Sequence, residues 1–273
     1  MKGRPVMEYE KVTEEQDYKR RSYNWKTAIG LQKVDNLVPS RYLIELANRN
    51  INGEISLSDV RDKIRDYYDN KPRKEEDPER QREADFVSQR ISEILSERAF
   101  TLSPVELLSI HKRLFEDIYE FAGKVRTCNI SKKEYILNGE TVEYGDCANL
   151  KEMMEHDIDK EKRFDYSALE DRERVSRFAT FISDLWQIHP FAEGNTRTTA
   201  VFAVKYLRTL GFDVDNDLFE KESWYFRNAL VRANYTDFKK NIHKSDVWLM
   251  KFLGNLLFGE KNELRNREMT VGG

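Results

Sequence analysis

Residues 188–202 read IHPFAEGNTRTTAVF, a polar loop followed at once by a helix-forming stretch. Pro190 biases the residue before it away from helix, so the amphipathic helix predicted for residues 172–187 ends there. Gly194 permits a tight turn, and an Asn or Thr side chain can cap a new helix that the apolar spacing carries to about residue 209. The stretch therefore joins two helices and aims its loop at the N-terminus of the second.

Helical periodicity covers most of the remaining chain. Apolar residues recur at turn spacing in residues 60–68, 83–95, 103–119, 147–159, 224–235 and 246–258. One segment, residues 123–144, alternates instead and is rich in Val, Ile, Tyr and Thr, with Asn138-Gly139 as a turn pair. We expect an all-α core with a small β-hairpin or extended flap that lies on the helical body.

The stretch NKPRKEEDPERQRE is charged, punctuated by proline and too polar to pack. It predicts a linker at residues 71–83. The expected organisation is then an N-terminal helical module at residues 1–70, a core at residues 84–262 and a C-terminal tail at residues 263–273.

Composition narrows the class of protein. The 273 residues include 46 basic and 49 acidic ones, so bulk charge gives no reason to expect a nucleic-acid partner. No apolar run approaches the length of a membrane span, and the N-terminus lacks an apolar signal core. Two cysteines provide no disulfide framework. We expect a cytoplasmic protein with no membrane association.

The loop at residues 189–197 carries side chains suited to phosphate chemistry. A helix N-terminus favours an anion through its free N–H groups and its dipole. Glu193 can hold Mg²⁺ together with phosphate oxygens, Arg197 can clamp phosphate, and Asn195 can donate to a neighbouring oxygen. His189 has an ordinary pKa suited to general-base work near neutral pH. Phe191 is expected to anchor the loop in the core.

Less specific interpretations explain this pattern poorly. A purely structural turn needs Gly and Pro, but not His, Glu and Arg at these offsets. A zinc site would need a third His or Cys with ligand spacing. His111 and His156 occur in polar helix contexts, so both are predicted to be surface or capping residues.

The segment HPFAEGNTR, with FAGKVRTCNIS upstream and ALVRANY downstream, resembles the Fic family over roughly residues 100–240. The resemblance implies a helical core with a flap, and transfer of AMP from ATP to a hydroxyl of a target protein with Mg²⁺. It implies His189 as the base, Glu193 as the metal ligand, Gly194, Asn195 and Thr196 as the anion seat, and Arg197 as a phosphate clamp. The flap residues that would dock the target are Asn129, Ile130, Ser131, Lys132, Lys133, Glu134 and Tyr135.

Two positions depart from the family pattern. Members that transfer AMP usually carry a second arginine where this chain has Ala200, and a glycine is common where it has Thr196. Two alternatives therefore stay open. One is phosphoryl transfer like that of the related Doc proteins, which usually carry lysine at the Thr196 position, and the other is a nucleotide-binding scaffold without turnover. The target could be another protein with an exposed Tyr, Thr or Ser, or the chain itself within a homo-oligomer.

Residues 24–64 are similar to the antitoxin-like helical segments that accompany some Fic proteins. Those segments carry Ser/Thr-x-x-x-Glu-Gly, and the glutamate blocks ATP by pairing with the second arginine. Here Leu31, Asp35 and Asn36 stand at the three motif positions, and the partner position is Ala200. We expect a degraded inhibitory motif on a module that packs against the core but restrains nucleotide weakly.

Overall fold

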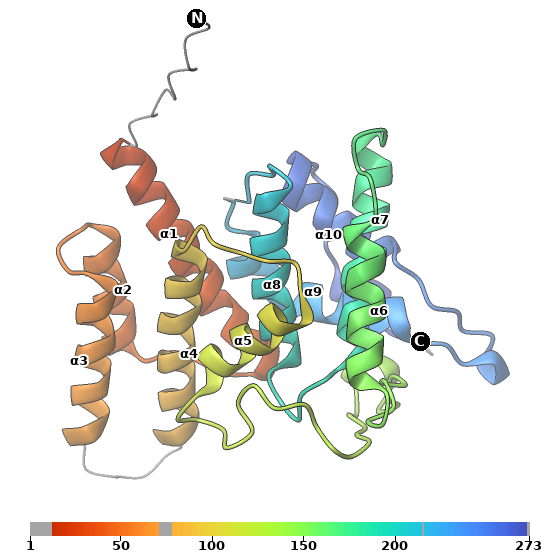
Figure 1. Cartoon of the computed structure of the whole chain (residues 1–273), viewed down its shortest axis with the longest axis horizontal. Coiled ribbons are helices and arrows are strands. Elements are labelled where there is room, and N and C mark those ends of the chain that lie inside the picture. Colours follow the sequence, from red (N-terminus) through yellow and green to blue (C-terminus); the bar gives the residue numbers. More distant parts are fainter. Residues whose placement is uncertain (1–12, 71–77, 215, 272–273) are drawn as a thin grey trace, which may run out of the picture.

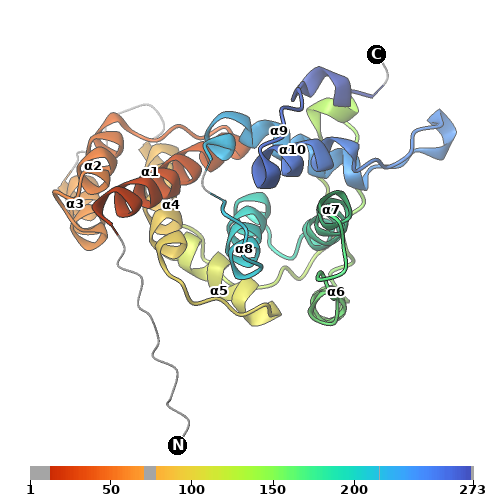
Figure 2. The same ribbon diagram turned by 90° about the horizontal axis from the view of Figure 1, so that it is seen from above.

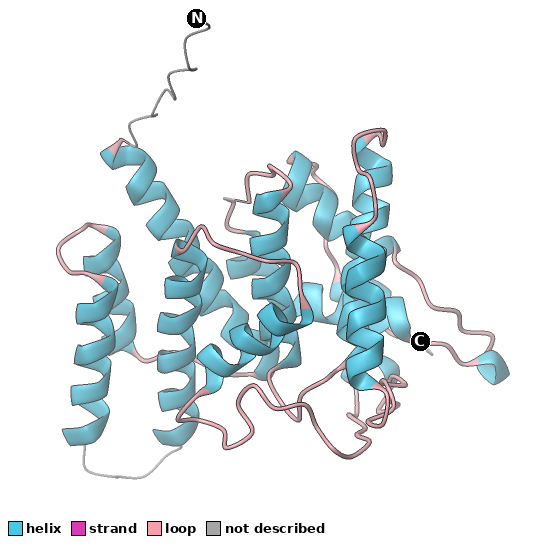
Figure 3. Cartoon of the chain, in the orientation of Figure 1, coloured by secondary structure: helices cyan, strands magenta, loops and turns pink. Residues whose placement is uncertain are grey.

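The computed structural model describes residues 13–70, 78–214 and 216–271. Over these ranges the chain forms helices joined by loops and no strand, which confirms the predicted all-α class (Figure 3). No helix in the described ranges is both long enough and apolar enough to span a bilayer. The α-helices are α1 (Glu14–Leu31), α2 (Arg41–Ile51), α3 (Leu57–Asn70), α4 (Pro78–Ser96), α5 (Pro104–Phe115), α6 (Leu150–Lys162), α7 (Asp171–Ile188), α8 (Asn195–Thr209), α9 (Leu218–Asn234) and α10 (Val247–Phe258). Short 3-10 helices are η1 (Gln32–Asp35), η2 (Tyr135–Leu137), η3 (Phe238–Lys240) and η4 (Asn266–Met269).

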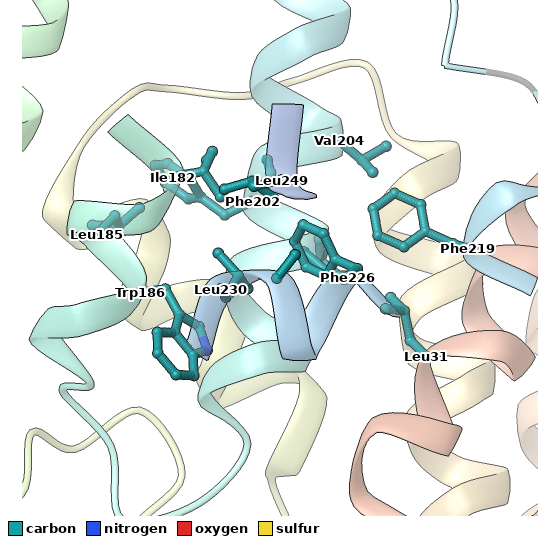
Figure 4. Close-up of a cluster of buried hydrophobic side chains, with 14 of the residues drawn as sticks. Leu31, Ile182, Leu185, Trp186, Phe202, Val204, Phe219, Phe226, Leu230 and Leu249 are labelled. Carbon is teal, nitrogen blue, oxygen red and sulfur yellow. The ribbon is translucent and has the colours of Figure 1, made fainter. Parts of the chain in front are cut away.

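Helix α8 is the centre of the molecule. Figures 1 and 2 both place it between the α2–α3 pair at one end and the α6–α7 pair at the other. It packs against α4, α5 and α7, and every residue from Asn195 to Leu207 is buried. Aromatic and aliphatic side chains of α1, α7, α8, α9 and α10 meet in the main core (Figure 4). The loop before α8 is therefore held from several sides.

The two helices that flank this loop begin and end for local reasons. The N-cap of α7 is Glu170, which forms a reciprocal capping box with Glu173. The helix ends at His189, whose φ of 50° lies in the left-handed region. Helix α8 follows Gly194, with φ of 78°, where an added Cβ would overlap the ring of Phe115. Glycine is thus required at this position by both backbone and space.

Helix α4 joins the N-terminal module to the core. It includes part of the stretch that was predicted to be a linker. A second apolar cluster contains Trp25, Leu43 and Ile64 of the module together with Phe86 of α4. The buried carboxylate of Asp85 accepts hydrogen bonds from the backbone and hydroxyl of Ser40 and from the hydroxyl of Tyr68. These contacts tie α2 and α3 to α4.

The predicted boundaries at residues 71–83 and 263–273 change accordingly. Residues 78–83 belong to α4, while residues 71–77 lie outside the described part of the chain. The charged stretch predicts a linker because its polar residues belong to the solvent-exposed first turns of α4. The predicted tail is packed: Met269 is buried, and the N–H of Val271 donates to the carbonyl of Ile136.

The flap, residues 123–144, is an extended loop rather than a β-hairpin. It forms part of the yellow-green connection between α5 and α6 below the helices in Figure 1. The turn at Asn138-Gly139 is present, with φ of 53° and 87°. The two arms pair through the backbone of Glu134 and Glu140, but Ile136 and Leu137 form η2 and are buried in the core. Because this apolar pair is buried in the core, the segment does not form the β-ladder that the alternation predicts.

Helix α1 approaches α9 closely at Gly30. An added Cβ there would overlap the carbonyl oxygen of Phe219 and lie 2.5 Å from the Cα of Glu220. In an open helix, Gly→Ala is stabilising by up to about 1 kcal/mol. Here we expect Gly30→Ala to lower the free energy of unfolding by about 1–3 kcal/mol, because the two backbones must separate. Denaturant titration measures this effect, and a stabilised variant would contradict the close contact.

Candidate active site

The loop at residues 189–194 is held in shape by two side chains from the start of α8. The Asn195 amide accepts from the N–H of Phe191 at 2.9 Å and donates to the carbonyl of the same residue at 2.8 Å. Thr196 Oγ1 accepts from the indole N–H of Trp186 at 3.0 Å, which ties α8 to α7. The Asn195 and Thr196 side chains are therefore used to shape the loop. An anion at this seat would be met by backbone N–H groups of α8, and not by the Asn195 amide as predicted.

His111 supports the same loop and corrects the prediction that it is a surface or capping residue. Its ring is buried and stacks on Phe191 with centroids 3.6 Å apart. Nε2 lies 3.0 Å from the Glu193 carbonyl, which can only accept, and Nδ1 accepts from the N–H of Gly123 at 2.8 Å. Burial lowers the pKa of His111 to about 4, so the ring is neutral. Phe191 is thus held in the core, the position predicted for the loop anchor.

His189 is held in one orientation at the end of α7. Its Nδ1 lies 3.2 Å from the carbonyl of Trp186, and its ring stacks on Tyr144 with centroids 4.0 Å apart. Because a carbonyl can only accept, Nδ1 carries the proton and Nε2 keeps a lone pair. Burial, opposed by the Trp186 contact and assisted by Lys132, Arg227 and Arg126, lowers the pKa of His189 to about 3. The imidazole is therefore neutral with its lone pair at Nε2, and it takes up a proton less readily than the ordinary pKa expected from the sequence implies.

The backbone around His189 is fixed by Arg126, a residue with no predicted role. Its Nε donates to the carbonyl of His189 at 2.8 Å, and its terminal nitrogens donate to the carbonyls of Cys128 and Gly145. The backbone N–H of Arg126 also donates to the carbonyl of Pro190 at 2.9 Å. One guanidinium thus joins the loop at residues 189–194 to the first arm of the flap and to Gly145, the residue that follows the flap.

The lowered pKa of His189 predicts a pH-dependent stability. Below about pH 6.5 the unfolded chain takes up a proton that the folded chain refuses, so stability is lost as pH falls. Between pH 7.5 and pH 5 we expect the wild-type free energy of unfolding to fall by about 2 kcal/mol more than that of His189→Asn. Asparagine tolerates the left-handed backbone and does not titrate. Urea titrations at both pH values measure the difference, with His156→Asn on α6 as control, and parallel curves for wild type and His189→Asn would contradict it.

Glu193 is the carboxylate nearest the start of α8. Its side chain is half-buried, and Oε1 accepts from the N–H of Gly194 at 2.9 Å. No group of three or more His, Cys, Asp or Glu residues in the described ranges could hold a metal. A single carboxylate at an anion seat fits Mg²⁺, which is commonly bound by one or two carboxylates and by substrate phosphate oxygens.

Arg197 is completely buried and surrounded by side chains from outside the loop. Its Nε lies 2.7 Å from Oδ2 of Asp35, and its terminal nitrogens contact Gln32 at 3.2 Å and Glu83 at 2.7 Å. The guanidinium also lies over the ring of Phe115. Burial alone would lower the pKa of Arg197, but the carboxylates of Asp35 and Glu83 raise it above its ordinary value. The predicted phosphate clamp is charged and already holds two carboxylates.

This contact corrects the expectation that the N-terminal motif has lost its partner. Asp35 pairs with Arg197, one turn before Ala200, and its side chain is only 13% exposed. Asn36 stands at the glycine position with φ of 54°, a left-handed conformation that asparagine adopts more readily than most residues. Leu31 is buried in the main core. The motif predicts position 200 as the partner of Asp35, whereas the acid reaches Arg197, three positions earlier.

The flap residues alternate between two environments. Asn129, Ser131, Lys133 and Tyr135 are exposed, whereas Ile130, Lys132 and Glu134 are half-buried or buried. Glu134 is not available to a target, because it forms a buried two-fold ion pair with Arg227 at 2.7 and 3.0 Å. Nζ of Lys132 lies 3.9 Å from Oδ1 of Asp35. Period-two alternation thus places Lys132 on the side of the site even though no strand forms.

The region of the chain that matches known proteins includes this loop. Residues 101–207 match the model of the Fic/DOC family. The chain is similar to the protein adenylyltransferase VbhT of Bartonella schoenbuchensis, with 31% identity over 48% of this chain and 29% of that protein. It is also similar to the probable protein adenylyltransferase y4lH of Sinorhizobium fredii, with 28% identity over 46% of this chain and 62% of that protein.

In both cases the match spans less than two thirds of the relative's length. The matched region contains the flap, the loop that carries His189 and Glu193, and α8 as far as residue 207. Residues 101–207 of this chain are therefore similar to the Fic/DOC family.

Proposed function

We propose that the chain is a protein adenylyltransferase that transfers AMP from ATP to a side-chain hydroxyl of a target protein. The observation that carries the proposal is the geometry of one loop: it holds a neutral His189 at one end and the N-terminus of α8, followed by Arg197, at the other. Two relatives of similar sequence are named as adenylyltransferases. A base beside an anion seat is the arrangement that such a transfer needs.

In the proposed reaction the hydroxyl oxygen of the target attacks the α-phosphorus of ATP. The bond from that phosphorus to the bridging oxygen breaks, and pyrophosphate leaves. Nε2 of His189 takes the hydroxyl proton, because Nδ1–H is already donated to Trp186. Backbone N–H groups of α8 and the guanidinium of Arg197 stabilise charge on the phosphate oxygens. Glu193 would hold Mg²⁺, which when bound neutralises phosphate charge.

The flap would dock the target through its extended backbone and its exposed side chains. Docking of an extended peptide rests largely on main-chain pairing, which accepts many sequences. Tyr135 at the flap turn has 82% of its surface exposed. A second copy of this chain, presenting such a tyrosine, is one target that fits, with self-modification as the result.

Adenylyl transfer is favoured over phosphoryl transfer by Thr196. Doc-like proteins, to which the loop is also similar, usually have a lysine here. In this chain the residue is uncharged, buried and bonded to Trp186. Position 196 therefore offers no cation that could bind the nucleotide in the way expected for phosphoryl transfer.

Intact-mass spectrometry tests the proposal. The purified chain is incubated with ATP and Mg²⁺, alone and with a bacterial protein extract, beside His189→Ala. We expect a gain of one AMP mass on the chain or on an extract protein only when His189 is present. Gain of a phosphoryl mass, or no His189-dependent gain on either, would overturn the assignment.

A further inference from the structure

Asp35 connects two cations that come from distant parts of the chain. Its Oδ2 lies 2.7 Å from Nε of Arg197 on α8, and its Oδ1 lies 3.9 Å from Nζ of Lys132 on the flap. The carboxylate therefore occupies a position at which an anion is attracted from both sides. A phosphate oxygen has the same charge and the same preference for ammonium and guanidinium donors.

Ala200 supplies no second cation from α8, because its methyl side chain carries no charge. Other cations near Asp35 are engaged elsewhere. Arg227 holds the carboxylate of Glu134 with two nitrogens, and Arg80 donates to the carbonyls of Asp35 and Asn36. The ion pair of Lys132 among the described residues is with Asp35 itself. Its side chain is 42% exposed, so the flexible stem can follow a ligand.

We propose that Lys132 is a nucleotide-phosphate ligand that takes the place of the cation missing at Ala200. Once Asp35 withdraws, Nζ of Lys132 contacts the β- or γ-phosphate of ATP, while Arg197 holds the same polyphosphate from α8. The inference rests on the proposed function, because it assigns a binding residue to that nucleotide. It also gives the flap a second task beside target docking.

The placement of Lys132 relative to the base is consistent with this task. Its charge is close enough to His189 to contribute to the lowered pKa of the imidazole. A polyphosphate that reaches from the loop toward Arg197 would therefore pass within reach of Lys132. Lys133, the next residue, is exposed on the opposite side of the flap and provides a control of equal charge.

The experiment is isothermal titration with ATP and with AMP, both with Mg²⁺, on Asp35→Ala protein and on three double variants. These combine Asp35→Ala with Lys132→Met, Lys132→Arg or Lys133→Met. We expect Lys132→Met to weaken ATP binding about tenfold and to leave AMP binding within about twofold, as for loss of one charge-assisted contact to an outer phosphate. Lys132→Arg should restore ATP affinity, and Lys133→Met should not change it.

Equal ATP affinity in the Lys132→Met and Lys133→Met proteins would overturn the inference while leaving the proposed function intact. Loss of AMP binding in parallel with ATP would also overturn it, since Lys132 would then act on the loop and not on the outer phosphates. If Asp35→Ala protein with Lys132 intact binds no ATP, both the proposed function and the role of Lys132 fall together.

Discussion

Replacing Asp35 with alanine is expected to raise the rate of AMP transfer. In the wild-type chain the guanidinium that would bind phosphate is buried under Asp35, Gln32 and Glu83. Nucleotide and Asp35 compete for this guanidinium, so removing the carboxylate lowers the free-energy cost of binding ATP. An intramolecular competition of this kind is typically worth about 1–3 kcal/mol, or roughly 5- to 150-fold. Glu83 remains on Arg197, so the release is partial.

The measurement is the initial rate of AMP incorporation at ATP concentrations below saturation. Asp66→Ala is the matched control, because Asp66 is an exposed aspartate of α3 in the same module. Asp35→Ala should act mainly by raising the apparent affinity for ATP. Equal rates for Asp35→Ala and Asp66→Ala would show that the Asp35–Arg197 contact does not restrain nucleotide.

Replacing His189 with alanine is expected to lower transfer by about 10²- to 10⁴-fold, the usual range for loss of a positioned general base. The effect is best measured in the Asp35→Ala background, where the starting rate is higher. Nε2 of His189 is the atom that accepts the hydroxyl proton, whereas phosphate is bound by α8 and Arg197. ATP affinity should therefore stay within about threefold while the turnover rate falls.

His156→Ala, on the surface of α6, is the control for this variant. Circular dichroism of both variants checks that the helices are retained. Transfer at the wild-type rate by folded His189→Ala protein would remove His189 from the mechanism and leave the loop as a binding element alone.

Local signals in the sequence predicted the helices around the site well. Pro190 and Gly194 act through their own backbone preferences, so the end of α7 and the start of α8 follow from the residues themselves. The flap was predicted less well. The alternation in residues 129–135 was recognised, but whether such a segment forms a ladder depends on where Ile136 and Leu137 are buried, which is a tertiary property.

The candidate site was predictable only for residues close together in the sequence. His189, Glu193 and Arg197 stand within nine positions and were recognised from one another. His111, Arg126 and Glu83 were missed, because each reaches the loop across a long stretch of chain and carries no spacing signal. Glu83 was also hidden inside a charged run. A glutamate that pairs with a buried arginine and a glutamate in a solvated linker can lie in sequences of the same composition.

The contact between Asp35 and Arg197 shows the same limit. Matching Asp35 to a motif predicted a lost interaction, whereas packing of α1 on α4 and α9 sets where the acid lies, and brings it to Arg197. A one-turn difference in the partner cannot be read from the motif. It follows from the depth at which η1 is inserted between α4, α8 and α9.

The most direct test of the account compares label transfer from two forms of ATP by Asp35→Ala protein, one labelled at the α-phosphorus and one at the γ-phosphorus. The account predicts that protein acquires the α-label in amounts that exceed the Asp35→Ala/His189→Ala background at least a hundredfold, and acquires no γ-label through His189. Transfer of the γ-label that depends on His189, or an α-label unchanged by loss of His189, would contradict it.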